Sequence, residues 1–327
     1  MKIALPVKLP GNKLPIIPTI KTSKTTDIIL FLKFKALKDS GILKLELTFF
    51  TNLFLAIISP YLRDLKTFLY INLSKPFMNL PSSFDVIGNI LILQEKTKAP
   101  KKLAKELLKH FSNVKTIVIK AGIHKGKYRL QKTKYIAGIK TKITLHKENN
   151  CLLKLDIDKC YFSPRLSNER LRIAKLVKKD ESILTMFSGI SAYPCTISKN
   201  SKPKEIYGIE LNPICNKFAQ ENIQLNKLNN IKLFQGDVKK VLPKIKKKFD
   251  RIIMPLPRNA ESYLDVAIKF LKKSGIIHFY DFQLEQDIPK KPIEKIQKHI
   301  KKFKILNVTK CGQYAPRKYR ICIDIKI

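Results

Sequence analysis

The sequence lacks the patterns that mark metal-binding and disulfide-linked proteins. Its six cysteines include no C-x-x-C pair, and its five histidines form no H-x-x-x-H pair and no cluster with cysteine. Zinc sites and disulfide frameworks are recognised by spacings of this kind. We therefore expect no metal site, and cysteines that stay reduced.

A membrane span and a secretory signal are also lacking. The most apolar stretch, residues 47–62, is interrupted by Thr51, Asn52 and Pro60. It is shorter than the roughly 20 apolar residues that a spanning helix needs. Prolines interrupt the first 18 residues, where a signal would need an unbroken apolar run. We expect residues 47–62 to be core, and the protein to be cytoplasmic and not bound to membrane.

Acidic residues are few compared with basic ones. Lysine and arginine number 65 against 25 aspartates and glutamates, which gives the 327 residues a formal net charge of +40 at pH 7. An imbalance of this size favours a polyanionic partner. Heat-adapted proteins are also rich in lysine, but they add glutamate with it, and an anionic membrane surface is a weaker alternative. We predict that the protein binds nucleic acid.

Composition and periodicity divide the chain into three parts. Residues 1–75 predict a small separate N-terminal module with a helix at 27–41. Residues 76–160 combine short β-like segments with one helix near 99–111, and they predict a compact α+β domain. In residues 161–327, apolar bursts alternate with helical stretches. That alternation is typical of an α/β domain with a doubly wound parallel sheet.

The third part predicts its elements in some detail. A helix is expected at 213–226, with Pro213 in its first turn. Two β-like runs, 301–310 and 319–327, predict a pair of antiparallel strands at the edge of the sheet, an ending frequent in class I methyltransferases. The parallel strands are expected at 182–187, 205–211, 231–235, 250–254 and 275–280.

Three residues mark a cofactor site at one end of this sheet. Ligands of such sheets bind outside the carboxyl ends of the strands, and an acid some 20 residues after the first turn takes the ribose hydroxyls. Gly189 ends the turn after the first strand, and Glu210 follows it by 21 positions at the end of the second strand. Asp237, after the third strand, is placed to accept from an adenine amine. Because Ser191 and Ala192 stand where glycines are usual, an ordinary strand-to-helix corner is the alternative.

The segment "YFSPRLSNER" (161–170) resembles the signature of the tRNA (guanine-37-N1)-methyltransferase family of archaea and eukaryotes. This resemblance implies a class I, Rossmann-like fold that binds S-adenosylmethionine, a middle domain that helps to hold the anticodon loop, and tRNA as the partner. We expect a monomer. The first 80 residues resemble nothing that can be placed. The similarity covers about residues 83–327 and includes 83–93, 126–129, 137–150, 186–189, 208–213 and 276–280.

The resemblance implies catalytic roles for three residues. Glu169 matches the general base that removes the N1 proton of guanine, and Arg129 matches the cation that stabilises charge on O6. Tyr161 matches an aromatic residue near the methionine and the target base. The plainer alternatives are a first-turn surface charge for Glu169, one of many basic side chains for Arg129, and a strand-end aromatic for Tyr161.

The resemblance also implies a set of binding residues, with three departures from the family pattern. Thr185 replaces a usual acid, the following loop has lost its second glycine, and Pro255 replaces a usual asparagine. The pocket for the target base is expected to include Arg129, Pro255 and Pro257. The expected cofactor contacts are Tyr161, Arg170, Phe187, Gly189, Glu210, Leu211, Asp237, Val238 and Pro255.

Pro255 bears on which reaction is performed. Proline offers a carbonyl but no N–H, so it presents a smoother wall that suits a larger, flatter base. An archaeal branch of the family is similar in having this proline with a glutamate at the position of Glu210. That branch forms N1-methylguanosine and also methylates C7 of 4-demethylwyosine to give isowyosine. We expect both reactions; N1 methylation alone, an aminocarboxypropyl transferase of the same pathway, and an inactive tRNA-binding protein are the alternatives.

Overall fold

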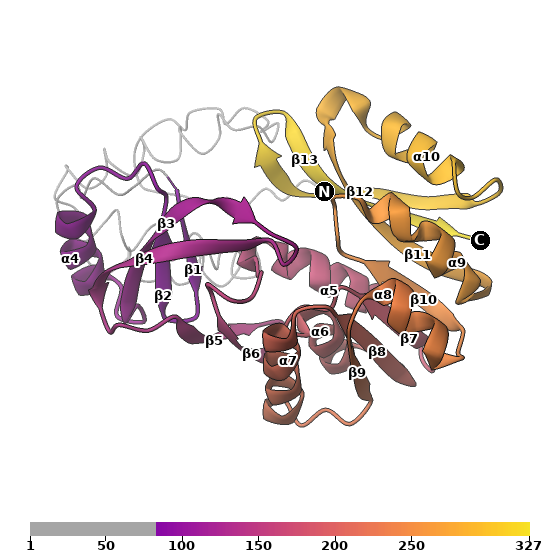
Figure 1. Cartoon of the computed structure of the whole chain (residues 1–327), viewed down its shortest axis with the longest axis horizontal. Helices are drawn as coiled ribbons and strands as arrows, with labels where there is room; N and C mark the ends of the chain where they lie inside the picture. The colour runs from indigo at the N-terminus through magenta and orange to yellow at the C-terminus, as the bar shows by residue number, and fades with distance from the viewer. Residues whose placement is uncertain (1–82) are drawn as a thin grey trace, which may run out of the picture. The chain divides into compact units, whose positions relative to one another are not determined.

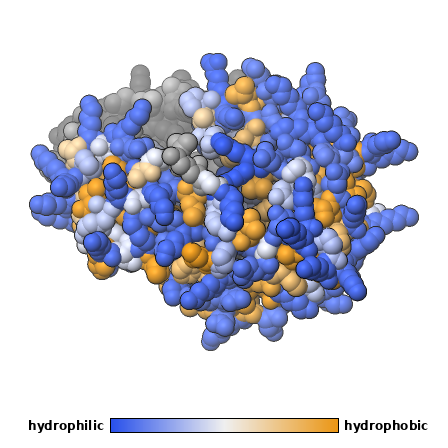
Figure 2. Space-filling model, viewed as in Figure 1, coloured by the Kyte–Doolittle hydropathy of each residue, from blue (hydrophilic) through white to orange (hydrophobic). Residues whose placement is uncertain are grey.

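The computed structural model describes residues 83–327, which belong to one compact unit, Leu80–Ile327. The predicted module 1–75, its helix at 27–41 and the apolar run 47–62 lie outside the described residues. No helix within 83–327 is both long and apolar enough to cross a membrane. Figure 2 shows hydrophilic side chains over most of the face it presents, as the abundance of lysine predicts.

Residues 84–138 form a small four-stranded sheet with one helix (Figure 1). Its order is β1-β2-β3-β4, and only β2 and β3 are parallel, because α4 connects them. Gly88 makes the turn between β1 and β2 at φ 56°, where an added Cβ would lie 2.2 Å from Thr144 Oγ1. This small sheet, with its helix, confirms the predicted α+β character. The elements are β1 (Phe84–Ile87), β2 (Ile90–Leu93), α4 (Pro100–His110), β3 (Thr116–Lys125) and β4 (Leu130–Gly138).

A hairpin of β5 (Ile143–Glu148) and β6 (Cys151–Asp156) forms a sheet of its own. It is held to helix α7 (Pro213–Leu225) by two asparagines. Asn222 accepts from the Lys154 N–H at 2.7 Å and donates to its carbonyl at 3.1 Å, and Asn226 bonds Leu152 in the same way. The hairpin therefore packs with the larger sheet, although it precedes residue 161. The three-part division of the chain stays a prediction.

The larger sheet has seven strands in the order β12-β13-β11-β10-β7-β8-β9. Strands β11, β10, β7, β8 and β9 are parallel, and β13 is antiparallel to both β11 and β12. The predicted alternation and the antiparallel ending are confirmed. The strands are β7 (Ser182–Met186), β8 (Glu205–Glu210), β9 (Ile231–Gln235), β10 (Phe249–Met254), β11 (Leu271–Leu284), β12 (Lys304–Ala315) and β13 (Lys318–Lys326).

The central parallel strands β7, β8 and β10 are buried on both faces, because helices cover the sheet on each side (Figure 1), whereas the edge strand β9 is only partly buried. Leu184 and Ile252 pack into one apolar cluster, while their neighbours Ile183 and Ile253 pack into another on the opposite face. The chain leaves β7 toward β8 and β9, then crosses to β10 on its other side. Ligands bind at such a switch point, beside the carboxyl ends of β7 and β10. The remaining helices are α5 (Ser167–Leu176), α6 (Ala192–Asn200), α8 (Val238–Val241), α9 (Leu264–Lys269) and α10 (Lys290–Gln297).

Candidate active site

The loop after β7 is organised around Glu210. The backbone N–H of Gly189 donates to Glu210 Oε2 at 2.7 Å, and that of Asn212 donates to Oε1 at 2.7 Å. Gly189 has φ 56°, and a Cβ placed there would meet only the Tyr161 carbonyl oxygen, at 3.9 Å. The backbone is therefore open to a ligand at the position that the sequence predicts.

Glu210 retains acceptor capacity for such a ligand. Burial raises the pKa of its carboxyl group, and backbone N–H groups of Asn212, Gly189 and Leu211 act in the opposite direction. An ionised carboxylate has about four lone-pair sites, and the two hydrogen bonds to Gly189 and Asn212 leave room for ribose hydroxyls. The open backbone at Gly189 and this carboxylate fit the nucleoside part of S-adenosylmethionine.

Asp237 lies at the same edge of the sheet, between β9 and α8. Its side chain caps α8 by accepting from the Lys239 N–H at 2.8 Å, and Val238 beside it is buried. The ring of Phe187, where the chain turns at φ 55°, meets the ring of Tyr263 edge-on at 4.8 Å. The predicted cofactor residues Phe187, Gly189, Glu210, Asp237 and Val238 thus follow the carboxyl ends of three neighbouring strands.

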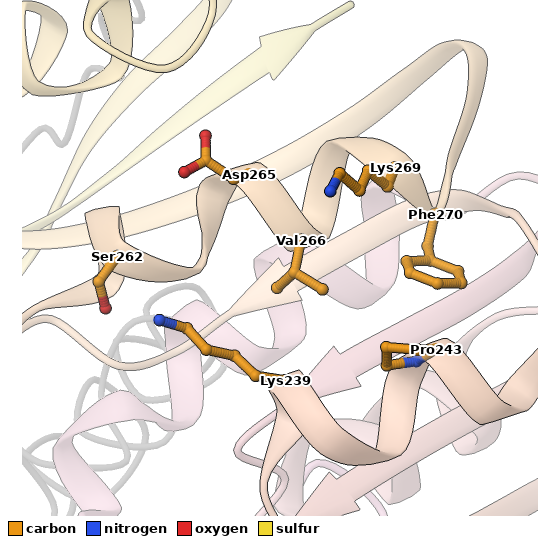
Figure 3. A pocket seen from close by; sticks show the side chains of 7 residues that line it. All are labelled: Lys239, Pro243, Ser262, Asp265, Val266, Lys269 and Phe270. Atoms are coloured by element: carbon orange, nitrogen blue, oxygen red, sulfur yellow. The ribbon is translucent and has the colours of Figure 1, made fainter.

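A groove between α8 and α9 lies on the flank of this edge (Figure 3). Lys239 at its mouth places its ammonium group 4.9 Å from the centre of the Tyr263 ring. No motif in the sequence predicts this groove, and no predicted site residue lines it. The lining side chains are Lys239, Pro243, Ser262, Asp265, Val266, Lys269 and Phe270.

Arg129 joins the small sheet to this edge. It lies between β3 and β4 at φ 53°, and its Nη2 donates to the Arg258 carbonyl at 3.0 Å. Burial, followed by the nearby charges of Arg258 and Arg320, lowers the pKa of its guanidinium. Arg258 follows Pro255 and Pro257, so the structure brings together the three residues expected around the target base.

Tyr161 lies where these groups converge. Its side chain is 40 % exposed, and its hydroxyl accepts from Arg320 Nη2 at 2.8 Å. Because its carbonyl also faces Gly189, Tyr161 connects the cofactor edge to the region around Arg129. This placement agrees with an aromatic residue between cofactor and target base.

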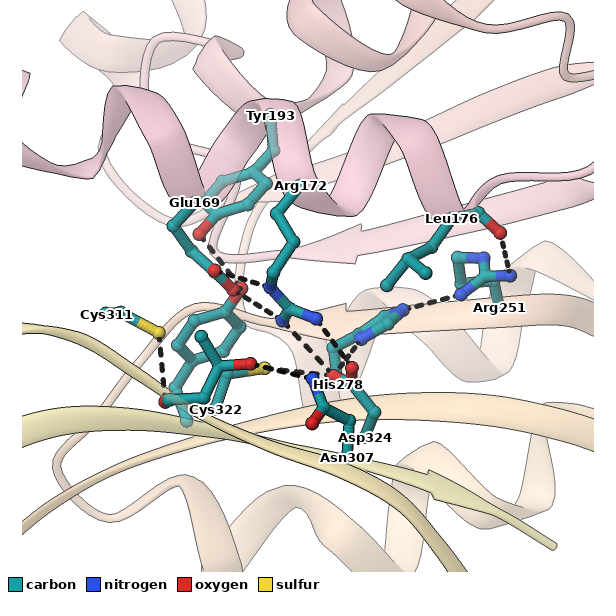
Figure 4. A network of polar contacts seen from close by, with 12 residues as sticks. Glu169, Arg172, Leu176, Tyr193, Arg251, His278, Asn307, Cys311, Cys322 and Asp324 are labelled. Atoms are coloured by element: carbon teal, nitrogen blue, oxygen red, sulfur yellow. Dashed lines mark hydrogen bonds and ion pairs between the residues drawn. The ribbon is translucent and has the colours of Figure 1, made fainter. Parts of the chain in front are cut away.

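Glu169 is held in a buried network of side chains (Figure 4). It is 5 % exposed, and it accepts from Arg172 Nε at 2.7 Å, from Arg172 Nη2 at 2.8 Å and from the Tyr280 hydroxyl at 2.5 Å. The pKa of the Cys311 thiol is raised by its burial and by the nearby carboxylate of Glu169. Glu169 is therefore not the exposed first-turn charge of the plainer alternative.

The network continues from Arg172 across strands β13, β11 and β10, on the face of the sheet that α5 covers. Arg172 Nη1 donates to Asp324 at 2.6 Å, Asp324 bonds His278 Nδ1 at 2.6 Å, and His278 Nε2 lies 2.7 Å from Arg251 Nη1. Arginine stays protonated, so Nε2 accepts and Nδ1–H donates, which assigns a neutral imidazole. Burial lowers the pKa of His278, and the hydrogen bonds from His278 and Arg172 hold that of Asp324 well below its usual range despite its burial.

His278, Cys322 and Asp324 bring their potential metal-ligand atoms within 4.8 Å of one another. Two guanidinium groups already bond this cluster, Arg251 at the imidazole and Arg172 at the carboxylate. A divalent cation would meet their positive charge at close range in a buried setting. We therefore interpret the group as part of the ion-pair network.

Arg170 points away from the cofactor edge toward the β5–β6 hairpin. Its guanidinium bonds both oxygens of Glu148, at 2.5 and 2.7 Å, and donates to the Ser163 carbonyl at 3.0 Å. The side chain is 3 % exposed and lies over the Phe162 ring. Its Nε and Nη2 donors are thus bonded within the protein, and its contact with the cofactor stays a prediction.

Two family profiles match the chain. The TRM5/TYW2 methyltransferase domain matches residues 144–308, and the TYW2 N-terminal domain matches residues 66–141. The chain belongs to the TRM5/TYW2 methyltransferase family. The resemblance seen in the sequence and the class I fold are thereby confirmed.

Relatives in this family differ in the group that they transfer. The tRNA (guanine(37)-N(1))-methyltransferase Trm5b of Pyrococcus abyssi is 37 % identical over 76 % of each chain. The tRNA (guanine(37)-N(1))/4-demethylwyosine(37)-methyltransferase Taw22 of Nanoarchaeum equitans is 33 % identical over 74 % of this chain and 99 % of that one. A tRNA(Phe) (4-demethylwyosine(37)-C(7)) aminocarboxypropyltransferase of Methanocaldococcus jannaschii is 32 % identical over 74 % and 97 %.

Solved structures of TRM5/TYW2 proteins share the fold. Trm5b of P. abyssi superposes with a TM-score of 0.69 at 36 % identity, covering 76 % of this chain and 75 % of that one. The aTrm5 complex with tRNALeu gives 0.68 at 32 %, covering 76 % and 72 %. TYW2 of M. jannaschii in complex with AdoMet gives 0.58 at 29 %, covering 75 % and 98 %. S-adenosylmethionine is confirmed as the cofactor of the family, whereas the roles of individual residues, a monomeric state and a cytoplasmic location stay predictions.

The sequence alone missed a group of site residues that lie on α5, on β10 and the loop after it, and on β11, β12 and β13. Glu169 and Arg129 were expected, but not their partners. The segment 276–280 was matched to the family without a role for any of its side chains. The missed residues are Arg172, Arg251, Arg258, His278, Tyr280, Tyr314, Arg320 and Asp324.

Proposed function

We propose that this TRM5/TYW2 protein methylates N1 of guanosine 37 in tRNA, with S-adenosylmethionine as the methyl donor. The observation that carries the proposal is the bond from Arg129 to the Arg258 carbonyl. It places a cation from the small sheet beside the loop that begins at Pro255, at the edge where Glu210 lies. Relatives named as enzymes of this reaction, and the relative solved with tRNALeu, support the substrate.

In the proposed reaction, the N1–H proton of guanine passes to the Glu169 carboxylate. The electron pair left on N1 is shared with O6, where the Arg129 guanidinium stabilises the negative charge. S-adenosylmethionine, held at Glu210 and the open backbone of Gly189, would supply the methyl group; its methyl–sulfur bond would break as N1 takes the methyl, and S-adenosylhomocysteine would be the leaving group. Tyr161, between the cofactor edge and Arg129, orients the base. The net charge of +40 attracts the tRNA backbone.

The buried position of Glu169 adds a requirement to this mechanism. Arg172 and Tyr280 supply three hydrogen bonds to its two oxygens, and the Cys311 thiol lies close. A carboxylate has about four acceptor sites, so about one remains for the N1–H, but because Glu169 is only 5 % exposed a neighbouring side chain has to move when guanine approaches. The same contacts fit a purely structural anion, and Glu169 is reduced to that role if Glu169→Gln methylates at the normal rate.

We propose in addition that the chain methylates C7 of 4-demethylwyosine. Pro255 follows β10 at the switch point, is half-buried, and offers no N–H to a guanine edge. Taw22, which is named for both reactions, is 33 % identical. Pro255→Asn should restore a polar group that suits guanine and lower C7 methylation more than N1 methylation. A buried polar group without a partner costs about 1–3 kcal/mol, which corresponds to about 5- to 150-fold.

Mass spectrometry of position 37 tests the proposal. Unmodified tRNA and tRNA carrying 4-demethylwyosine are each incubated with the protein and S-adenosylmethionine. One methyl group on each substrate is the expected result. A methyl group on guanosine alone removes the C7 reaction, and an aminocarboxypropyl group on the tricyclic base replaces it. Calorimetric binding of S-adenosylmethionine with no product on either tRNA would identify an inactive RNA-binding protein.

A further inference from the structure

Six residues form a linked series of contacts beside the proposed target base, which we call the arginine–aromatic ring. Arg129 bonds the Arg258 carbonyl, and Arg258 Nη2 donates to the Tyr314 hydroxyl at 2.9 Å. The ring centres of Tyr314 and Phe282 lie 4.3 Å apart. Arg320 completes the series. Its guanidinium lies 5.1 Å from the centre of the Phe282 ring, and its Nη2 donates to the Tyr161 hydroxyl. Arg320 and Tyr161 both act on the pKa of Arg129.

The ring stands at the edge where ligands bind. Phe282 lies near the carboxyl end of β11, which is parallel to β10, and Tyr314 and Arg320 lie near the turn that joins β12 to β13. Phe282 pairs with Arg320 across β11 and β13. The turn of this hairpin is therefore beside the loop after β10 that carries Arg258, and next to Tyr161.

The ring gathers strong positive charge. Three guanidinium groups converge, and the charges of Arg258 and Arg320 help to lower the pKa of Arg129 after its burial. Within residues 83–327, the side chains of Arg258 and Arg320 bond tyrosine hydroxyls and no carboxylate. Arg320 Nε is buried without a hydrogen-bond partner in that part of the chain. Tyr314 is 50 % exposed, so an aromatic surface is available beside these cations.

We propose that the arginine–aromatic ring binds the nucleotide adjacent to the target base, with the base stacked on Tyr314 and the phosphate bonded by Arg258 and Arg320. A planar guanidinium matches the geometry of a phosphate, and an exposed aromatic ring stacks on any base. This inference rests on the proposed tRNA substrate and assigns a second subsite to it. Within the ring, Tyr314, Arg258 and Arg320 read the RNA strand next to position 37, whereas Arg129 and Tyr161 serve the target base itself.

Fluorescence of a stacked base tests the Tyr314 contact. The full chain is mixed with an anticodon stem-loop RNA that carries 2-aminopurine on the 5′ side or the 3′ side of the target guanosine. Binding should quench one of the two probes with the native protein. It should do the same with Tyr314→Phe, which keeps an aromatic side chain at this position. Tyr314→Ala should lose the quenching and bind about 5- to 150-fold more weakly. Equal quenching and affinity for Tyr314→Ala and the native protein would overturn the proposal.

Salt dependence tests the phosphate contact. Arg258→Ala should lower the slope of log K against log [salt] by about 0.7, the value for one contact to a single strand, whereas Arg258→Lys should keep it. Both variants retain the carbonyl that Arg129 bonds. Lys310→Ala is the control, because Lys310 lies on β12, the strand that carries Tyr314, but is paired with Glu285 at 2.7 Å. An equal loss of slope for Lys310→Ala would mean diffuse attraction and no defined subsite.

These measurements separate this inference from the proposed function, because binding is read without methyl transfer. Quenching that depends on Tyr314 in a protein that fails to methylate guanosine 37 would overturn the function and leave the subsite. Normal methylation of guanosine 37, with no effect of Tyr314→Ala on quenching or affinity, would overturn the subsite and leave the proposed function. Calorimetric affinity for S-adenosylmethionine should be unchanged in every variant, and it shows that the exposed substitutions leave the fold intact.

Discussion

Two buried carboxylates of the site, Glu210 and Glu169, are held in different ways. Glu210 accepts from backbone N–H groups of Gly189 and Asn212, which belong to the two loops beside it. Glu169 accepts from the side chains of Arg172 and Tyr280, and Tyr280 lies 111 positions away in the sequence. The orientation of Glu210 is thus set by backbone groups, while that of Glu169 depends on two side chains, one from the next turn of α5 and one from the distant strand β11.

This difference has a chemical consequence. A carboxylate held by backbone amides keeps one geometry and suits the static task of binding ribose hydroxyls. A carboxylate held by side chains can exchange a donor when substrate arrives, as proton transfer requires. Substitutions at partner side chains should therefore affect Glu169 and leave Glu210 unchanged.

The largest expected effect is on Glu169 itself. Glu169→Gln should lower N1 methylation in single turnover by about 10²- to 10⁴-fold, because an amide cannot take the N1 proton. The affinity for S-adenosylmethionine should be unchanged. Rapid-quench assays with saturating tRNA measure the rate, and a near-normal rate would restrict Glu169 to the structural role.

Removing Arg172 should reduce stability more than removing an exposed arginine. Arg172→Met leaves the carboxylates of Glu169 and Asp324 without their shared cation, and loss of one partner from a buried pair costs about 3–5 kcal/mol. Arg165→Met is the matched control, since Arg165 is 57 % exposed and pairs with Asp85; such pairs contribute about 0–1 kcal/mol. Urea unfolding of both variants measures the difference, and equal losses would mean that the network is not a buried ion-pair system.

Substitution of Glu210 should weaken the binding of S-adenosylmethionine and leave the proton transfer from guanine unchanged. Glu210→Gln loses acceptor capacity toward the ribose, and the expected loss of about 1–3 kcal/mol weakens S-adenosylmethionine binding about 5- to 150-fold. Calorimetry measures this affinity, with Glu169→Gln as the comparison that should bind normally. If the two variants lost cofactor affinity equally, the two carboxylates would share one role.

The smallest expected effect is on the pH dependence of stability. His278 is neutral in the folded protein because burial lowers its pKa, so below about pH 6.5 the unfolded chain binds more protons than the folded one. Its contribution is fully present above that pH and declines below it, by at most about 1.4 kcal/mol per pH unit. Urea unfolding between about pH 7.5 and 5.5 should show a flatter decline for His278→Gln, and an unchanged slope would indicate that His278 is charged in the fold.

Periodicity predicted the larger sheet well. Burial on both faces concentrates apolar residues in the central strands β7 and β10, and Pro213 marks the first turn of α7. The β5–β6 hairpin was harder, because the asparagines that hold it, Asn222 and Asn226, are far along the chain. Strand β4 was not predicted, since its exposed, lysine-bearing sequence has no clear alternation.

The cofactor edge could be predicted from spacing, but the partners of Glu169 could not. The distance from Gly189 to Glu210 reflects one strand–helix–strand unit, which sequence order preserves. Arg172 and Asp324 meet only because β13 inserts into the sheet beside β11, and no local pattern in either segment records that meeting. Buried ionisable residues in strands are visible in the sequence, whereas their pairing is a property of the tertiary structure.

The insertion of β13 between β11 and β12 has a consequence for synthesis of the protein on the ribosome. Asp324 is added 152 positions after Arg172, so the nascent chain holds the arginine long before its aspartate exists. Until β13 is translated, the edge of β11 with Ile277 and Phe279 has no strand to cover it, and an open apolar edge invites pairing with other chains. The strand that completes the network around Glu169 is thus also the one that ends this vulnerable period of translation.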